Sequence, residues 1–283
     1  MLMSLDVHIR SARYSNNNVL KDIDFRLDTG GVLTIVGESG AGKTTLGRIV
    51  AGLDKFYKID FEGYVRSSEK IGYVPQSLSE SMDPVFSIEY QMKEIKNNLA
   101  LLKNTLLDVG LKDVDRILKS YPHNLSGGMK QRALIALALL DSKTVVADEP
   151  TSALDKTTQR QIVKLFEDLN KNSGISIIFI THDLDLLKFD SSVIVLYNGL
   201  IIEYANSRDL LKNPMHPYTR ILINAAPKAD MHYDTDRFAV LDNIEQSNDM
   251  CPFVNICEKR CDCCYTQFPK LKDVGGRLLR CHV

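Results

Sequence analysis

The sequence predicts an α/β protein that combines a mostly parallel sheet with an antiparallel β-subdomain, a helical insertion and a small cysteine-rich C-terminal extension. Three observations lead to this fold class. Short apolar runs typical of buried strands alternate with amphipathic segments that have helical spacing. A stretch rich in Lys, Asn, Leu and Asp, residues 77–120, interrupts the alternation. All six cysteines lie between residues 251 and 281, which indicates a local metal or cluster site in the C-terminal part.

The first half of the chain is predicted to contain strands, a helix and the insertion. Residues 19–40 alternate apolar and polar side chains and then become continuously apolar, as in half-exposed strands that lead into a buried one. Residues 44–53 continue at helical spacing. Residues 90–110 have a helical pattern that ends at Gly110. We therefore expect a helical subdomain at about 77–140.

The second half returns to the alternation of strands and helices. Residues 143–150 and 175–183 are predicted buried strands, separated by an amphipathic helix over 157–172 that ends near Gly174. Residues 191–205 form a predicted hairpin with Asn198 and Gly199 at its turn. The composition changes after residue 225, so we expect one domain over 1–228 and a second unit, the extension, over 229–283.

Composition excludes several classes of protein. The formal net charge of −1 gives no overall attraction to nucleic acid or anionic lipid, and we expect no nucleic-acid partner. The longest apolar runs, 133–140 and 175–180, are too short to cross a bilayer, and the N-terminus has no secretory signal pattern. We therefore expect a cytoplasmic chain that is soluble by itself.

Residues 37–45 match the pattern of a phosphate-binding loop. The sequence GESGAGKTT follows an apolar strand and precedes a helix, which is the context that this motif requires. Backbone amides and the helix N-terminus can surround phosphates, Lys43 can reach the outer phosphates and Thr44 can bind Mg²⁺. The predicted nucleotide-binding residues of the loop are Gly37, Glu38, Ser39, Gly40, Ala41, Gly42, Lys43, Thr44 and Thr45.

Polar residues follow three other predicted strands. Asp148 and Glu149 end one buried strand, His182 follows the next, and Gln76 ends a short strand before the insertion. Open α/β sheets bind ligands at the carboxyl ends of their strands. Beside a phosphate loop, Asp148 is suited to hold Mg²⁺ through water, Glu149 to polarise or deprotonate an attacking water, and His182 to contact the γ-phosphate.

A second glycine pair occurs in the sequence LSGGMKQR, residues 125–132. Gly127 and Gly128 run directly into an apolar helix, and no lysine is placed to bind a phosphate. Taken alone, the pair is a plain turn before a helix.

The ordered set GESGAGKTT, PQ, LSGGMKQR, VVADEPTSALD and ITHD resembles the nucleotide-binding subunit of an ABC transporter over about residues 5–225. The resemblance implies an ATPase fold in which two domains pair head to tail. Ser126, Gly127 and Gly128 of one domain would then cap the ATP that the other domain holds. It further implies that Tyr14 stacks on adenine, that Gln76 senses Mg²⁺ and the lytic water, and that Asp155 communicates between the paired sites.

Met129, the sequence MDP at 82–84 and the segment 213–227 resemble the peptide and nickel importer subfamily. The resemblance implies an ATPase that powers import of oligopeptides or dipeptides, or alternatively of nickel or a metal chelate. Its partners would be a second ATPase subunit, expected to be a paralogue, two membrane permease subunits and an extracellular solute-binding protein. The chain would lie peripherally at the cytoplasmic side of the cell membrane. The alternative from another class is a soluble ABC-type ATP switch without a transport role.

The C-terminal cysteines also resemble those of this subfamily, in which some members hold a [4Fe–4S] cluster. Carried over by position, the ligands would be Cys251, Cys257, Cys264 and Cys281. Zinc bound by four thiolates is an alternative, and free thiols are a third. Cys261 and Cys263 have no counterpart in the pattern, so the identity of the third ligand stays open.

Overall fold

The structure, a computed structural model, describes residues 3–77, 81–152, 154–224 and 250–282. The larger of two sheets contains β3 (Val32–Val36), β5 (Ile71–Val74), β6 (Thr144–Asp148), β7 (Ser176–Thr181), β8 (Ser192–Tyr197), β9 (Leu200–Asn206), β10 (Lys272–Asp273) and β11 (Leu278–Leu279). The smaller sheet contains β1 (Met3–Tyr14), β2 (Asn17–Asp28) and β4 (Ile59–Ser67). The helices are α1 (Lys43–Val50), α2 (Ile88–Ile95), α3 (Leu99–Asp108), α4 (Val114–Lys119), η1 (Pro122–Asn124), α5 (Gly127–Leu139), α6 (Lys156–Ser173), η2 (Leu184–Lys188), α7 (Ser207–Lys212), α8 (Pro217–Asn224) and α9 (Cys263–Thr266).

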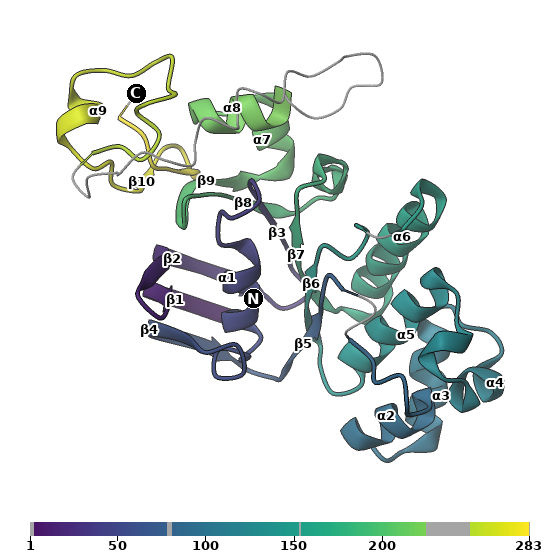
Figure 1. Ribbon diagram of the computed structural model, residues 1–283. Helices are drawn as coiled ribbons and strands as arrows, with labels where there is room; N and C mark the ends of the chain where they lie inside the picture. Colours follow the sequence, from purple (N-terminus) through teal and green to yellow (C-terminus); the bar gives the residue numbers. More distant parts are fainter. Residues whose placement is uncertain (1–2, 78–80, 153, 225–249, 283) are drawn as a thin grey trace.

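The larger sheet has the strand order β10-β11-β9-β8-β3-β7-β6-β5 (Figure 1). The five strands from β8 to β5 are parallel, and β9, β11 and β10 follow in antiparallel pairing at one edge. Every residue of β6 and β7 is buried, as expected for parallel strands that are covered on both faces. The predicted mixed α/β architecture is therefore confirmed.

Two apolar cores lie on opposite faces of the larger sheet. Successive residues of a strand point to opposite faces, so Val145 and Phe179 join the core that α5 and α6 cover, whereas Val146 and Ile178 join the other. Side chains of α1 and of the smaller antiparallel sheet complete this second core. The sheet thus separates a helical layer from a layer that includes the β-subdomain.

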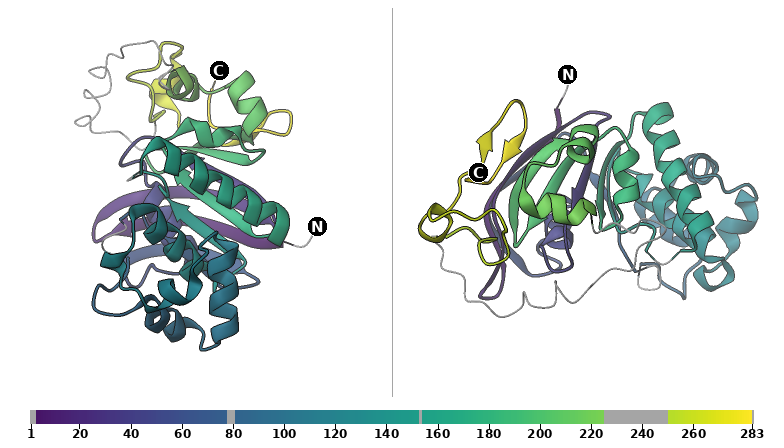
Figure 2. Two further views of the ribbon diagram at one scale, coloured as in Figure 1. Left: turned by 90° about the vertical axis from the view of Figure 1, so that its right-hand side faces the viewer. Right: turned by 90° about the horizontal axis from the view of Figure 1, so that it is seen from above.

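The helical insertion forms one end of the molecule, opposite the C-terminal segment (Figure 2). The predicted helix over 90–110 is divided into α2 and α3. Lys96 is extended, with φ −145° and ψ 117°, and the side chain of Asn98 accepts a hydrogen bond from the amide of Leu101. Because asparagine favours the position before a helix, a new helix starts there.

Two predicted boundaries are confirmed. Helix α6 ends at Gly174, which has a φ of +65° that glycine adopts without a Cβ clash. The hairpin of β8 and β9 turns at Asn198 and Gly199, both with positive φ. A Cβ atom at Gly199 would collide with the carbonyl oxygen of Val19, so this turn also requires glycine in order to pack against β2.

The C-terminal segment continues the larger sheet, which the sequence did not predict. Strand β11 pairs with β9, and the guanidinium of Arg280, the residue that follows β11, is buried. This group donates to the carbonyl oxygen of Ile201 at 2.9 Å and to the carboxylate of Asp22 at 2.7 Å. The expected boundary at 228/229 lies outside the described residues. The described part of the extension is therefore attached to the domain by pairing and by a buried cation.

Among the described residues, no helix combines the length and the apolar character that crossing a membrane requires.

Burial of His216 predicts a decrease of stability in acid. This imidazole, next to the buried Glu203, accepts a hydrogen bond from the amide of Tyr218, and burial lowers its pKa to about 4. The unfolded chain therefore binds the proton more readily between pH 6.5 and 4. The free energy of unfolding should fall by about 3 kcal/mol over this range on account of His216. Urea denaturation at several pH values measures the effect. The variant His216→Gln should show a shallower dependence, and an equal dependence would contradict the assignment.

Candidate functional site

The loop 37–45 joins the carboxyl end of β3 to the N-terminus of α1. Gly42 precedes the helix with φ +97°, and a Cβ atom there would approach Leu20 to 2.8 Å. Glycine is therefore required both by the backbone conformation and by the contact with β2. Within the described part of the chain no side chain caps α1, so its first amides are available to an anion.

Lys43 has a largely buried side chain, only 6% exposed. Its ammonium donates hydrogen bonds to the carbonyl oxygens of Gly37 at 2.8 Å and Glu38 at 2.6 Å. Burial lowers the pKa of Lys43, and the carboxylates of Glu149, Asp148 and Glu38 oppose that effect. The cation is thus held in the loop by acceptors that a phosphate oxygen can replace.

Asp148, at the end of β6, lies beside Thr44 of the loop. Its carboxylate accepts from the hydroxyl of Thr44 at 3.2 Å and from the hydroxyl of Tyr73 at 2.8 Å. Burial raises the pKa of Asp148, and these two hydrogen bonds oppose the increase. A threonine hydroxyl next to a carboxylate supplies oxygen ligands of the kind that Mg²⁺ prefers.

Gln76, Glu149 and His182 form a second polar group beside the loop. One carboxylate oxygen of Glu149 accepts from the amide of Gln76 at 2.7 Å, and the other lies 3.0 Å from Nδ1 of His182. Glu149 has φ +46°, a strained conformation for this residue type. Three different strand ends therefore bring together the side chains that the sequence placed at separate positions.

Tyr14 lies half-buried at the end of β1. Its hydroxyl accepts a hydrogen bond from Arg48 of α1 at 3.3 Å, and the guanidinium of Arg48 lies 3.8 Å from the ring centroid of Tyr57. The structure thus connects Tyr14 to the helix that follows the loop.

The second glycine pair starts α5. The hydroxyl of Ser126 accepts from the amide of Met129 at 3.4 Å, and Gly127 begins the helix. Asp155 caps α6 nearby by accepting from the amides of Thr157 and Thr158. A hollow of about 450 Å³ is bordered by Gly110, Leu111, Ser126, Gly127, Gly128, Met129, Arg132, Leu154, Asp155, Thr158 and Gln161. Because none of these residues belongs to the loop 37–45, the two predicted phosphate-binding elements are separate within one chain.

Two family profiles match this chain. A family profile described as "ABC transporter" matches residues 20–152, and one described as "Oligopeptide/dipeptide transporter, C-terminal region" matches residues 202–264. "Oligopeptide transport ATP-binding protein AppD" of Bacillus subtilis (strain 168) is 34% identical over 292 residues, which cover 92% of this chain and 89% of that protein. The chain belongs to the ABC transporter ATPase family.

One further relative and one solved structure are also similar to this chain. "Oligopeptide transport ATP-binding protein OppD" of Lactococcus lactis subsp. cremoris (strain SK11) is 36% identical over 237 residues, 74% of this chain and 70% of that protein. The dimeric structure of a post-hydrolysis state of the ATP-binding cassette MJ0796 bound to ADP and Pi has a TM-score of 0.60 and 25% identity. It covers 73% of this chain and 99% of that one. The protein is accordingly an ATPase that uses ATP and Mg²⁺.

Tyr73 contacts the candidate site through Asp148, and the sequence analysis missed it. It lies on β5, three positions before Gln76, and burial followed by the charge of Asp148 raises its pKa, so the hydroxyl stays protonated as a donor. In the sequence, the only indication was the alternation of side chains along β5, which places Tyr73 close to the strand end that precedes Gln76. Its proximity to Asp148 follows from the parallel pairing of β5 with β6.

The cysteines of the extension lie around α9. Cys251, Cys257 and Cys264 are buried and Cys281 is half-buried, all four as free thiols. The amide of Cys251 donates to the carbonyl oxygen of Cys264 at 2.8 Å. Burial, together with the charges of Cys264, Cys281 and Cys257, raises the pKa of Cys251 to about 11. Cys251, Cys257 and Cys264 share one apolar neighbourhood, since all three belong to the same buried core.

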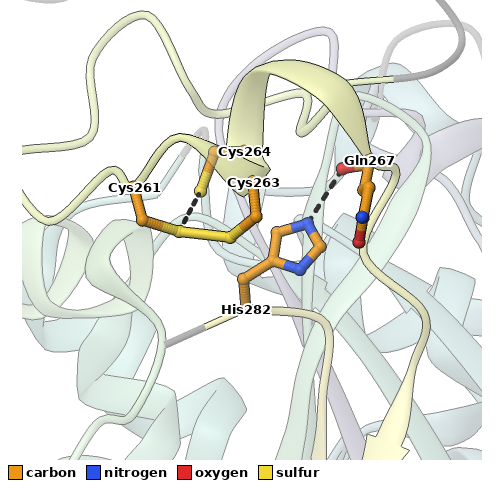
Figure 3. The surroundings of a disulfide bond; sticks show 5 residues. All are labelled: Cys261, Cys263, Cys264, Gln267 and His282. Carbon is orange, nitrogen blue, oxygen red and sulfur yellow. Dashed lines mark hydrogen bonds between the residues drawn. A yellow bond between two sulfur atoms is a disulfide. The ribbon is translucent and has the colours of Figure 1, made fainter.

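Cys261 and Cys263 are joined by a disulfide next to this neighbourhood (Figure 3). The sulfur of Cys261 lies 3.5 Å from that of Cys264, and the three sulfur atoms of Cys261, Cys263 and Cys264 lie within 4.8 Å of one another. His282 contacts the carbonyl oxygen of Gln267 at 2.8 Å. The closest group of sulfur atoms thus includes Cys264 and both cysteines that have no counterpart in the subfamily pattern.

Removal of the Tyr73 hydroxyl should weaken the response of the ATPase to Mg²⁺. In Tyr73→Phe, Asp148 loses a hydrogen bond worth about 1 kcal/mol and with it a fixed orientation. The Mg²⁺ concentration for half-maximal ATPase activity should rise about fivefold at saturating ATP. The control is Tyr64→Phe, because the ring of Tyr64 lies against His8 on the smaller sheet. An unchanged Mg²⁺ dependence would show that Tyr73 does not orient Asp148.

Proposed function

We propose that the chain is the ATP-hydrolysing subunit of a peptide importer and works peripherally at the cytoplasmic face of the cell membrane. The observation that carries the proposal is the joint match of an ABC transporter profile and an oligopeptide/dipeptide transporter C-terminal profile to one chain. The printed names of the relatives, oligopeptide transport ATP-binding proteins, support it. A second ATPase subunit, expected to be a paralogue, two permease subunits and an extracellular solute-binding protein would complete the transporter.

Hydrolysis is proposed to proceed by in-line attack of water on the γ-phosphate. Lys43 and the amides at the start of α1 would bind the phosphate oxygens. Glu149 would orient the water and accept its proton, while Gln76 and His182, which contact its two carboxylate oxygens, fix its direction. Thr44, Asp148 and Gln76 would hold Mg²⁺, which neutralises charge on the phosphates when bound.

A complete site is proposed to need two ATPase subunits. The hollow beside Ser126 and Gly128 presents a hydroxyl and the N-terminus of α5, a helix of thirteen residues, but lies apart from the loop of the same chain. Such a group can cap a γ-phosphate that a neighbouring subunit binds. Asp155 lines the same hollow and is therefore placed to respond to the neighbour's nucleotide. Tyr14 is proposed to stack on the adenine.

The variant Glu149→Gln tests the hydrolysis mechanism. It keeps the shape of the side chain but cannot accept a proton, so ATP should still bind while turnover falls at least about 100-fold. The control is Glu62→Gln on β4, where the side chain is exposed and pairs with Arg10. Turnover at the parental rate in Glu149→Gln would remove this residue from the catalytic role.

Reconstitution tests the transport function. The chain should purify as a complex with permease subunits, and in vesicles its ATPase activity should rise when oligopeptides and the solute-binding protein are added. Stimulation by a nickel chelate instead of peptides would assign a metal cargo. Copurification with ribosomes or DNA in place of permeases would contradict the proposal and indicate a soluble ATP switch.

We also propose that Cys251, Cys257, Cys264 and Cys281 bind a [4Fe–4S] cluster, with zinc as the alternative. The residues fit such a group in that these four are free thiols and three of them, Cys251, Cys257 and Cys264, lie in one core, whereas Cys261 and Cys263 are linked to each other. Burial disfavours thiolates in the absence of a cation, so a bound metal would stabilise them. A cluster would supply a covalent cross-link between segments of the extension and a one-electron redox centre.

Metal analysis after anaerobic purification tests this site. The expected result is about four iron atoms per chain with broad visible absorption, both lost in Cys257→Ser. Stoichiometric zinc without absorption would favour the alternative, and absence of metal would leave free thiols. Cys263→Ser is the matched control and should keep the iron, because Cys263 is not among the proposed ligands. Loss of iron in that variant would show that the ligand set was assigned incorrectly.

A further inference from the structure

Tyr218 connects the phosphate loop to a distant part of the chain. It lies on α8 with only 1% of its surface exposed. Its hydroxyl oxygen accepts a hydrogen bond from the backbone amide of Glu38 at 3.0 Å. Glu38 belongs to the loop 37–45, so a tyrosine 180 positions later in the sequence anchors the first turn of the loop.

The anchored residue also holds the lysine of the loop. The carbonyl oxygen of Glu38 accepts a hydrogen bond from the ammonium of Lys43 at 2.6 Å. Glu38 is therefore fixed by Tyr218 on its amide side and by Lys43 on its carbonyl side. A displacement of the Tyr218 hydroxyl would therefore move the backbone of Glu38, which positions the ammonium of Lys43, the proposed phosphate-binding cation.

The side chain of Glu38 is half-buried. Its Oε1 atom is buried and has no hydrogen-bond partner among the described residues. Burial raises the pKa of Glu38, and Lys43 opposes the increase. Burial, and secondly the charge of Glu38, raise the pKa values of both Tyr197 and Tyr218. Both phenol groups therefore stay protonated, and that of Tyr218 faces this end of the loop.

Tyr218 is in turn held by the C-terminal segment. Its ring packs edge-on against Phe253, with 5.7 Å between ring centroids, and lies 4.7 Å from the ring of Tyr197. Phe253 is buried two residues after Cys251 and belongs to the apolar core that contains Cys251, Cys257 and Cys264. In Figure 1, α8 and the C-terminal segment lie together on one side of β8 and β9. The aromatic contacts thus form a continuous path from the cysteines to the loop.

We propose that Tyr218 is a positioning residue for the phosphate loop, and that through Phe253 it couples ATP affinity to the packing of the cysteine-bearing segment. In this proposal Tyr218 does not contact ATP itself but acts through the backbone of Glu38. A pre-organised loop binds a ligand more tightly than one that must be ordered on binding. The inference concerns nucleotide binding, so it does not depend on the identity of the transported solute.

The variant Tyr218→Phe tests the positioning role, because it removes the hydroxyl and keeps the ring that packs on Phe253. In the full chain carrying Glu149→Gln, in which hydrolysis is suppressed, the Kd for ATP with Mg²⁺ should rise about fivefold, the effect of one lost hydrogen bond. In the chain with Glu149 intact, KM for ATP should rise similarly while kcat changes less than about twofold. Tyr265→Phe, at an exposed position of α9, is the control and should leave both constants unchanged.

The variant Phe253→Leu tests the coupling. It keeps the Tyr218 hydroxyl but loosens its support, so the Kd for ATP should rise by a smaller factor. In the double variant the Kd should equal that of Tyr218→Phe alone, because Phe253 acts through the hydroxyl. Thermal unfolding of each variant shows whether the fold is intact. An unchanged Kd in Tyr218→Phe would overturn the positioning role. A fall in kcat as large as the change in KM would overturn it as well. If the increase of the Kd in the double variant equals the product of the increases in the two single variants, the coupling is overturned.

Discussion

The buried ammonium of Lys43 is the constraint on which the nucleotide site depends. A buried cation is stable only when acceptors and negative charges surround it. Here the carbonyl oxygens of Gly37 and Glu38 accept from it, and the carboxylates at the end of β6 oppose the decrease of its pKa. Such an arrangement requires a loop of glycines whose carbonyl groups turn inward. It also requires an acidic strand end next to that loop.

The parallel sheet meets both requirements through its geometry. Parallel strands end at the same edge, so the segments after β3, β5, β6 and β7 converge although they are far apart in the sequence. The positive φ of Glu149 directs its carboxylate to a point where Gln76 and His182 both reach it. Local strain of this kind persists because the buried strands on either side determine the backbone. The same sheet leaves Ser126 and Gly128 on another surface, apart from the loop 37–45, which is why the proposed capping of ATP requires a second chain.

The C-terminal segment is part of the same structural unit. Strand β11 extends the sheet at β9, and Arg280 is buried with Asp22 of β2 as its charged partner. Glu203, fully buried on β9, accepts hydrogen bonds from the amides of Met215 and His216 and pairs with Arg277. Removal of one partner would leave a buried charge uncompensated, so these pairs hold the segment on the domain. The segment can therefore transmit its own packing to the loop, which an independent appendage could not do.

The sequence by itself determined the class of fold, the position of the phosphate loop and the order of the motifs. These features depend on local properties: the spacing of apolar residues, glycines that permit positive φ, and residue types suited to phosphate and Mg²⁺. It also identified Gln76, Glu149 and His182 as strand-end residues. The tertiary structure alone decided what long-range packing controls. Examples are the contact of Tyr73 with Asp148, the anchoring of Glu38 by Tyr218, and the pairing of β11 with β9. Such contacts join residues that no local pattern relates, because they arise only when separate strands and helices pack against one another.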